Sequence, residues 1–418
     1  MHFQSGAKQY IQRIGMLSRN AKLYLTATVM QGLSSGIWGV IFYLYLNLPE
    51  IGYQPDFIGN MFMASALATG FVALPAGLIC ERIGLKKAII ISYTANFFSL
   101  IQIFVLQAPL LLFASLSSGL IGTIGWVASA PFMMENSRKE ERTYLFSVSW
   151  ALMIIMGVVG SYIGGVIPDS INMSAGLPTG ENGSAFGYRI ALGISVVLAL
   201  TSLLPIALVK EEKKLERQRM TELLSLRNIR SPATIVKFMI PTGIIGFGAG
   251  FIVPLFNLFF KLRFSATTEQ IGIISALSSV TLAIGTLAAP LLCERLGKVK
   301  SVVLCQFLSM PFIMLMTLAP NLALASASFI TRGALMNMVG PISTTLQMEL
   351  VTENERATTN GLMVMADNIP RAVTASVSGK MMSESDFLTP FMITTFTYFM
   401  ASSLYYVFFR KAETKQAS

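Results

Sequence analysis

Three charged side chains stand within apolar segments that are long enough to cross a bilayer: Arg332 in 322–348, and Asp367 and Arg371 in 360–382. A charge at the centre of a membrane costs roughly 2.5–3.5 kcal/mol on insertion scales, which makes each residue a functional candidate. At a rise of about 1.5 Å per residue, Arg332 lies roughly 15 Å into its segment and Arg371 about 16 Å into the other. We therefore expect all three near the middle of the membrane.

Two kinds of chemistry are open to these residues. The arginines can attract an anionic group of a ligand, and Asp367 can accept a proton. Because Asp367 lies four residues before Arg371, the two side chains can instead form a structural ion pair on one helix face. A structural role is also the alternative for Arg332. If Asp367 is not the proton site, Glu135 and Glu349 at the ends of two other segments are the candidates.

Polar and aromatic residues of the apolar segments can line a binding site for an amphipathic organic molecule. The candidates are Trp38, Tyr43, Trp126, Asn257 and Asn337. Ordinary packing is the alternative for each of them. The only histidine is His2, and no phosphate-binding Gly-x-x-x-x-Gly-Lys-Ser/Thr sequence occurs. We therefore expect no enzymatic activity, no cofactor and no metal site.

The composition of the chain is that of a membrane protein. Of 418 residues, 53% are hydrophobic and 12% are charged, and the mean hydropathy is +0.63. Soluble proteins carry about 25% charged residues, so a soluble enzyme, a disordered chain and a nucleic-acid-binding domain are excluded. Apolar blocks of about 20 residues, the length that crosses a bilayer as a helix, recur along the chain. The twelve predicted spans are 23–48, 57–79, 88–106, 110–134, 144–167, 188–209, 238–260, 270–293, 301–318, 322–348, 360–382 and 388–409.

The charges outside these spans are sorted by side. With twelve spans, most of the 31 lysines and arginines gather on the face that holds both termini. The loops of the other face carry the acidic residues Glu50, Asp56, Asp169, Glu181, Glu269, Glu384 and Asp386. Because basic residues mark the cytoplasmic side, we expect both termini in the cytoplasm and the protein in a plasma (cell inner) membrane. The net charge of +10 then reflects topology rather than an acidic partner.

The two halves of the chain repeat one another. Cys80-Glu-Arg-Ile-Gly84 follows the second span, and Cys293-Glu-Arg-Leu-Gly297 follows the eighth. Gly59 with Gly272 and Gly165 with Gly379 match at nearly the same offset along the chain, and we call residues related in this way repeat-equivalent. A duplicated six-span unit is typical of secondary transporters, whose site lies between the halves near the bilayer midplane.

The longest polar stretch divides the chain into these halves. The predicted domains are an N-terminal half at 1–209, a cytoplasmic linker at 210–237 and a C-terminal half at 238–418. A surface helix is expected within the linker. Residues 1–22 are expected to form either an interfacial helix or a tail.

The sequence after the second span resembles the signature of the major facilitator superfamily, Gly-x-Leu-Ala-Asp-Arg-x-Gly-Arg-Lys-Lys. Here it reads Gly77-Leu-Ile-Cys-Glu-Arg-Ile-Gly-Leu-Lys-Lys87, with Glu81 in place of Asp and Leu85 in place of the first basic residue after the glycine. A shorter copy ends at Gly297 after the eighth span. The resemblance implies an all-α polytopic membrane protein of twelve helices in two six-helix repeats, with spans 1, 4, 7 and 10 lining a cavity.

The resemblance also implies that this signature holds the halves together at the cytoplasmic face when the protein is open to the outside. Gly84 permits a tight turn, and the basic residues can pair with acids and with lipid phosphates. A topology anchor alone is the alternative. The residues expected in this gate are Gly77, Glu81, Arg82, Gly84, Lys86, Lys87, Glu135, Arg142, Glu294, Arg295, Gly297, Glu349 and Arg356.

A glycine-rich run in the fifth span, Gly157–Gly165, resembles the Gly-Pro-x-x-Gly-Gly motif of drug–proton antiporters, with Ser161 in place of the proline. Close packing of helices is the alternative explanation for such small residues. In the fourth span, Ser115 stands where these antiporters carry an arginine. The absence of this arginine argues against the standard antiport relay.

These observations predict secondary active transport of a small organic solute by alternating access. Proton-coupled export of a drug or metabolite is the leading interpretation. Proton-coupled uptake of an organic anion, which Arg332 and Arg371 favour, and flipping of a lipid or lysolipid are alternatives; a receptor without transport is the last. The expected partners are the solute, protons or another coupling ion, and the bilayer, with no nucleic acid and the chain as a monomer.

Overall fold

Helices make up almost all of the described chain. The computed structural model describes residues 18–135, 142–180, 183–210, 231–352 and 356–410. The N-terminal half contains α2 (Arg19–Leu46), α3 (Pro55–Ile83), α4 (Leu85–Thr94), α5 (Asn96–Phe104), α6 (Ala108–Glu135), α7 (Arg142–Ser174), α8 (Ala185–Thr201) and α9 (Leu203–Ala207). The C-terminal half contains α11 (Pro232–Ile252), the 3-10 turn η3 (Val253–Leu255), α12 (Phe256–Phe264), α13 (Thr268–Leu296), α14 (Lys298–Leu318), α15 (Leu322–Leu350), α16 (Arg356–Ser383) and α17 (Leu388–Phe409). The expected linker helix and the N-terminal segment up to residue 17 lie outside the described residues.

The chain is a multi-pass integral membrane protein. Eleven spans in the described ranges are long and apolar enough to cross a bilayer. The 28-residue helix α16 is long enough but too polar to be counted with them, because Asp367, Arg371 and Lys380 interrupt its apolar sequence. It nevertheless packs between α3 and α11 as the eleventh helix of the expected order. The predicted all-α fold of two six-helix repeats is confirmed.

Three predicted spans are broken rather than continuous. The third divides at Ala95 into α4 and α5, where the Asn96 amide donates to the Tyr93 carbonyl at 2.8 Å and competes with the helical pattern. The sixth divides at Ser202 into α8 and α9, three residues before Pro205. The seventh passes through η3, which contains Pro254. Proline lacks the N–H that a continuous helix needs, which accounts for the last two breaks.

The loop expected to begin at Pro168 begins later, because α7 continues to Ser174. Proline is tolerated within membrane helices when neighbouring groups satisfy the freed backbone. The fully buried Asn172 fixes the turn that follows: its amide donates to the Ser184 carbonyl and its oxygen accepts from the Gly187 N–H, both at 2.9 Å. These hydrogen bonds join the last turns of α7 to the residues that begin α8 (Ala185–Thr201).

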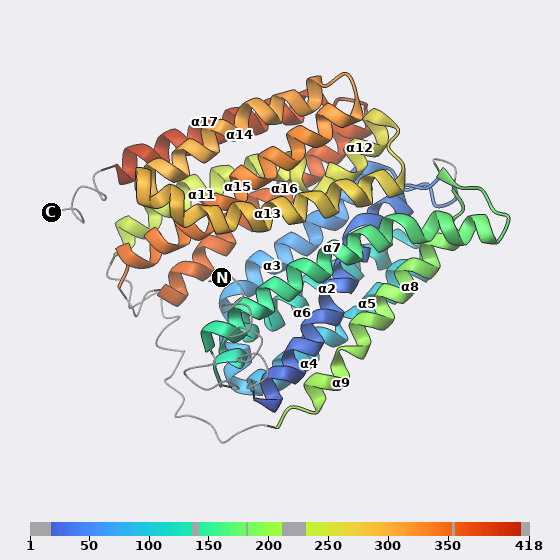
Figure 1. Cartoon of the computed structure of the whole chain (residues 1–418), viewed down its shortest axis with the longest axis horizontal. Coiled ribbons are helices and arrows are strands. Elements are labelled where there is room, and N and C mark those ends of the chain that lie inside the picture. Colours follow the sequence, from blue (N-terminus) through green and yellow to red (C-terminus); the bar gives the residue numbers. More distant parts are fainter. Residues whose placement is uncertain (1–17, 136–141, 181–182, 211–230, 353–355, 411–418) are drawn as a thin grey trace, which may run out of the picture.

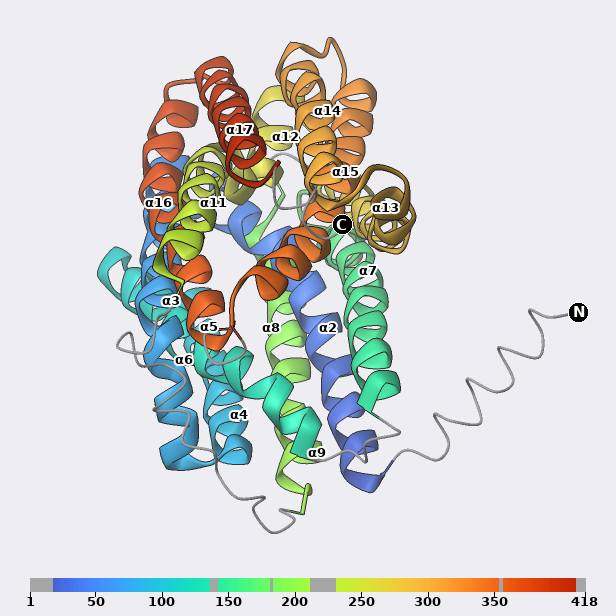
Figure 2. The same ribbon diagram turned by 90° about the vertical axis from the view of Figure 1, so that its left-hand side faces the viewer.

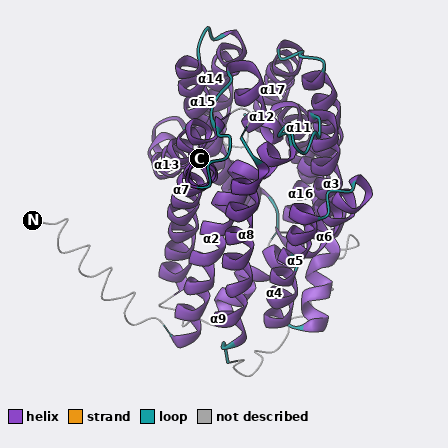
Figure 3. Ribbon diagram, turned by 90° about the vertical axis from the view of Figure 1, so that its right-hand side faces the viewer, coloured by secondary structure: helices purple, strands orange, loops and turns teal. Residues whose placement is uncertain are grey.

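The two halves meet at one end of the molecule. We call the end that carries Arg19 and Arg410 the basic end, and the end that carries Asp56 and Asp386 the acidic end. Figure 1 shows the two bundles close together at the acidic end and diverging toward the basic end, and Figures 2 and 3 view the molecule from these two ends. The most extensive contacts between the halves are those of α3 with α16 and of α7 with α13, and α2 also contacts α12 and α13.

The same close backbone contact joins the halves twice. A Cβ on Gly59 of α3 would clash with the carbonyl oxygen of Ala375 on α16. A Cβ on Gly272 of α13 would likewise clash with the carbonyl oxygen of Ser161 on α7. Gly272 is repeat-equivalent to Gly59, and Ala375 is repeat-equivalent to Ser161, so matching residues form both contacts. Only glycine permits this approach, and the pair of contacts gives the interface a pseudo-twofold symmetry.

Hydrogen bonds reinforce the acidic end. The Asn257 amide of α12 donates to the Gly39 carbonyl of α2 at 2.9 Å, across the boundary between the halves. The hydroxyls of Tyr188 and Thr268 form a second inter-half hydrogen bond and are buried. The acidic end is therefore closed by both packing and polar contacts.

Candidate functional site

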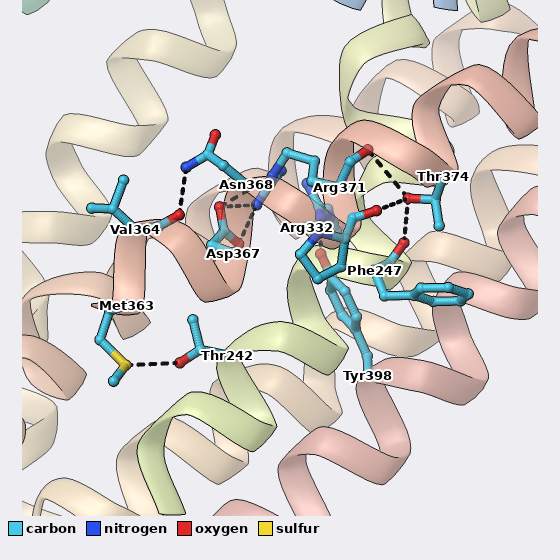
Figure 4. Close-up of polar contacts among 11 residues, drawn as sticks. Thr242, Phe247, Arg332, Met363, Val364, Asp367, Asn368, Arg371, Thr374 and Tyr398 are labelled. Carbon is cyan, nitrogen blue, oxygen red and sulfur yellow. Dashed lines mark hydrogen bonds and ion pairs between the residues drawn. The ribbon is translucent and has the colours of Figure 1, made fainter. Parts of the chain in front are cut away.

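The Asp367 and Arg371 side chains form an ion pair halfway along α16. Arg371 Nη2 lies 2.6 Å and 2.8 Å from the two carboxylate oxygens of Asp367, and Arg371 Nε lies 3.1 Å from Oδ2 (Figure 4). The Asp367 side chain is 29% exposed and that of Arg371 is 19% exposed. The pair is therefore partly accessible and not sealed within the helix bundle.

Glycines on α11 determine how closely this pair approaches the neighbouring helix. A Cβ on Gly246 would clash with the backbone of Asp367, and a Cβ on Gly250 would clash with the backbone of Arg371. One turn further along α16, Thr374 donates to the Phe247 carbonyl of α11 at 2.8 Å. The small residues thus let α11 pack directly against the part of α16 that carries both charges.

Arg332 of α15 is held by aromatic residues. Its side chain is buried, with 7% exposure, and Nη2 donates to the Tyr398 hydroxyl of α17 at 2.7 Å. The guanidinium carbon lies 5.6 Å from the Phe256 ring centroid and 5.7 Å from that of Tyr398, within the range of cation–π attraction. Within the described part of the chain, the buried Nε of Arg332 has no hydrogen-bond partner.

The three charges predicted near the midplane thus lie in one region of the C-terminal half (Figure 4). Tyr398 connects them, because it accepts from Arg332 and lies within electrostatic range of Arg371. The site contains two guanidinium groups and one carboxylate. Asp367 is the only acidic residue well inside any predicted span of the whole sequence. The cluster therefore carries one positive charge that no carboxylate at this depth balances.

Tyr398 and Phe256 were not among the predicted site residues. Phe256 lies in the predicted span 238–260 and Tyr398 in the predicted span 388–409. Tyr398 is 66 residues from Arg332 in the sequence, so no local spacing relates the two. The only sequence feature that could have indicated Tyr398 was the series of aromatic residues in the last span. They did not distinguish Tyr398 from its neighbours.

The other predicted binding residues do not join the cluster. Asn337 is exposed and donates to the Gly333 carbonyl of its own helix at 2.7 Å. Asn257 forms the inter-half hydrogen bond at the acidic end. Trp38 is half-buried and stacks on a phenylalanine of α2, and Tyr43 is half-buried in the same helix. Trp126 of α6 is 66% exposed and meets Trp150 edge to face at 6.1 Å.

The described gate residues form contacts within their own halves. Gly84 and Gly297 each end a helix with a positive φ, +90° and +80°, which favours glycine. Lys86 Nζ donates to the Val209 carbonyl at 2.7 Å within the N-terminal half, and Glu349 pairs with Lys298 within the C-terminal half. The remaining described gate side chains, which are exposed, are Arg82, Lys87 and Arg295.

Several predicted gate positions lie outside the described side chains. These are Gly77, Glu81, Glu135, Arg142, Glu294 and Arg356. Among the residues that the structure does describe, no group of three or more His, Cys, Asp or Glu side chains could hold a metal ion.

Comparison with solved structures shows the same fold. The chain superposes on a D-xylose–proton symporter with a TM-score of 0.73 at 14% identity, over 95% of this chain and 97% of that one. A bacterial homologue of the human lysosomal transporter Spinster, in an inward-facing and unoccupied conformation, gives a TM-score of 0.72 at 12% identity over 93% and 97% of the two chains. A nucleoside transporter gives 0.70 at 15% identity over 93% and 100%.

Sequence comparison gives the family. An UNC93-like protein of Schizosaccharomyces pombe is 24% identical over 145 residues, which are 33% of this chain and 28% of the yeast protein. The matched part therefore spans about a quarter of that relative. Residues 24–260 and 238–418 each match the sequence profile of the Major Facilitator Superfamily, and the two matches together cover both halves. With the whole chain covered and the fold shared with its transporters, this protein belongs to the major facilitator superfamily.

Proposed function

We propose that this chain is a proton-coupled exporter of a small organic solute that works by alternating access in a plasma (cell inner) membrane. The observation that carries the proposal is the partly exposed Asp367–Arg371 pair halfway along α16. Proton coupling requires a group within the membrane that binds and releases a proton, and a carboxylate at this depth is a candidate for it. The family and its transporter structures support the transport function.

The proposed orientation places the basic end in the cytoplasm. Lys and Arg enrichment at that end supports it through the positive-inside rule. With the acidic end closed by the Gly59 and Gly272 contacts, the structure then corresponds to a state that faces the cytoplasm. Substrate would enter from that side, and opening of the acidic end would release it outside.

Protonation of Asp367 offers a direct route to this change. A proton on the Asp367 carboxylate removes its charge and weakens its hydrogen bonds with Arg371. The next two residues, Asn368 and Ile369, are those that Gly70 of α3 approaches across the boundary between the halves. A shift of α16 caused by loss of the ion pair would therefore act directly on the inter-half interface.

Proton-coupled uptake of an organic anion is a second candidate. The unbalanced positive charge of Arg332 and Arg371 favours an anionic solute, and symport with a proton would move that solute without net charge. The glycine-rich run of α7 supports export by its resemblance to antiporters, although Gly160 and Gly164 pack against α2. The direction of proton movement distinguishes the two candidates.

The test uses inverted membrane vesicles that contain the full-length protein and a pH gradient reported by acridine orange. Drug-like cations, neutral compounds and small carboxylates are added one at a time. Export predicts that at least one compound dissipates the gradient in the wild type and that none does so in Asp367→Asn. The matched control, Asp386→Asn in the acidic-end loop, should behave as the wild type.

Three outcomes would contradict the proposal: no compound dissipates the gradient, Asp367→Asn retains full activity, or flux occurs without any response to ΔpH. Entry of a carboxylate together with protons would instead select the uptake candidate. Expression and thermal stability of each variant are measured in the same membranes, so that loss of folding is not read as loss of coupling.

A further inference from the structure

We infer that the cluster of Arg332, Arg371 and Tyr398 is a binding site for the anionic group of an organic monoanion, whose apolar part packs beside Phe256. The inference rests on the proposed function, because it names the class of substrate for the same transporter. It concerns recognition of the solute and is independent of the direction of transport.

The charge of the cluster is the first reason. The region contains two guanidinium groups and one carboxylate, which is paired with Arg371, and no other acidic residue lies well inside any predicted span. An unbalanced charge is unfavourable at this depth, and a single bound anion would bring the net charge of the cluster from +1 to zero. A neutral solute would leave the imbalance in place, and a cation would increase it.

The geometry of Arg332 is the second reason. One terminal nitrogen is held by the Tyr398 hydroxyl at 2.7 Å, which fixes the orientation of the guanidinium group. Its buried Nε has no hydrogen-bond partner among the residues that the structure describes. A buried donor without a partner is unfavourable in an apolar environment. A carboxylate or sulfonate oxygen that accepts from Nε would satisfy it.

The repeat supplies the third reason. Arg332-Gly333 is repeat-equivalent to Ser118-Gly119 of α6, and the glycines keep the same neighbour: Gly119 contacts Ser65, and Gly333 contacts the repeat-equivalent serine of α13. At this position of the repeat, α6 therefore carries a small neutral side chain and α15 carries Arg332. Packing alone does not require the arginine.

The first test measures what Arg332 does to the protein without ligand. Thermal unfolding of the purified full-length protein is compared for the wild type, Arg332→Met and the matched control Arg189→Met. Arg189 Nε also donates to a tyrosine hydroxyl, that of Tyr45 at 3.1 Å, but Glu50 lies within electrostatic range of the same tyrosine. We expect Arg332→Met to keep or raise the unfolding temperature, and Arg189→Met to lower it.

The second test measures binding. Phenylacetate and octanoate are added to the purified protein, each beside its neutral amide, and the unfolding temperature is followed across a concentration series. At least one carboxylate should raise the unfolding temperature of the wild type, and its amide should not. Loss of a charged hydrogen bond should weaken that binding about tenfold or more in Arg332→Met, with partial recovery in Arg332→Lys.

Four results would overturn the inference: no carboxylate stabilises the wild type, an amide stabilises it equally, Arg332→Met retains the full response, or Arg332→Met is destabilised as much as Arg189→Met. These failures are distinguishable from failure of the proposed function. The vesicle assay with Asp367→Asn reports proton coupling for any compound class, so a transporter of neutral solutes would pass that assay and fail this one.

Discussion

The two repeats pack their first and fifth helices in the same way. In the N-terminal half, a Cβ on Gly32 of α2 would clash with Met156 of α7 and would lie close to the Met153 carbonyl. In the C-terminal half, the repeat-equivalent glycine is Gly246 of α11, and it approaches Asp367, which is itself repeat-equivalent to Met153. Glycine-mediated contact between these helices is therefore a property of the repeated unit.

The side chains at this contact differ completely in charge. Met153 and Gly157 of α7 are repeat-equivalent to Asp367 and Arg371 of α16. No Asp, Glu, Lys, Arg or His lies well inside a predicted span of the N-terminal half. The small residues at this contact therefore occur in both repeats, whereas the ion pair occurs in only one of them.

The largest expected effect comes from transferring the N-terminal residues into the C-terminal half. The double variant Asp367→Met/Arg371→Gly should keep most of its stability, because the same residues pack in α7, but it should lose proton-coupled transport. Arg371→Gly alone should cost about 2–3 kcal/mol, below the roughly 3–5 kcal/mol of a fully buried broken pair, because it leaves Asp367 unpaired at partial exposure. Thermal unfolding and the vesicle assay measure both quantities.

If the double variant is no more stable than the single one, the charges are required for folding, and the contrast between the repeats fails. Met153→Leu in α7 serves as the control for a substitution at the equivalent position without charge, and it should transport normally.

A second prediction concerns the contact that both repeats share. Leu in place of Gly59 or of Gly272 should hold the acidic end open, because the new side chain meets the opposing backbone. A cysteine introduced at Ser376, beside the Gly59 contact, should then react at least several-fold faster with a membrane-impermeant maleimide. Gly122→Leu is the matched control, since nothing lies within 4 Å of a Cβ at Gly122.

Pseudo-twofold symmetry requires the Gly59 and Gly272 variants to give similar rates. If only one of them exposes the cysteine, the two inter-half contacts are not equivalent in function.

A smaller effect is expected for Asn257→Ala. The Asn257 amide donates to the Gly39 carbonyl at 2.9 Å and to the Val40 carbonyl at 3.3 Å across the halves. A net hydrogen bond is worth about 0.5–1.5 kcal/mol, so the maleimide rate at the Ser376 cysteine should rise by less than in the glycine variants. If the labelling rate is unchanged and substrate binding is lost, Asn257 contacts the substrate instead of closing the acidic end.

The smallest effect is expected at Asp386, which caps the first turn of α17. Hydrogen bonds from the Thr389 side chain and backbone hold the pKa of Asp386 below its ordinary value of 3.8. Its stabilisation is therefore fully present above that value and is lost as the pH falls through the folded-state pKa. Asp386→Ala should lower the free energy of unfolding at pH 7 by about 1 kcal/mol or less, and this loss should shrink as the pH falls through the folded-state pKa of Asp386. Glu384→Ala in the same loop is the control.

Local patterns were sufficient for much of the architecture. Apolar blocks of helical length and the repeat of Cys80–Gly84 at Cys293–Gly297 predicted a twelve-helix, two-repeat membrane protein. The pairing of Asp367 with Arg371 followed from their spacing along one helix. These inferences succeed because each depends on residues that are neighbours in the sequence or lie at a constant offset.

The remaining features depend on contacts between distant segments. Nothing in the sequence near Arg332 indicates Tyr398, which reaches it from another helix, and Asn257 has a polar side chain compatible with either a ligand or a carbonyl of α2. Asn172 lies in the part of α7 that continues beyond Pro168, and its hydrogen-bond partners lie after the turn. Residue types cannot decide such contacts without the packing.

The polarity of α16 has a consequence for how the protein is made. Asp and Arg each disfavour the transfer of a helix into the lipid by roughly 2.5–3.5 kcal/mol at the helix centre. The helix α16 therefore has little tendency to move from the insertion channel into the lipid by itself. Its receiving surfaces, α3 and α11, are both synthesised before it. Membrane integration of α16 is therefore coupled to assembly of the earlier helices, and misfolding of either half would leave this one segment stranded outside the bilayer, where quality-control proteases could recognise it.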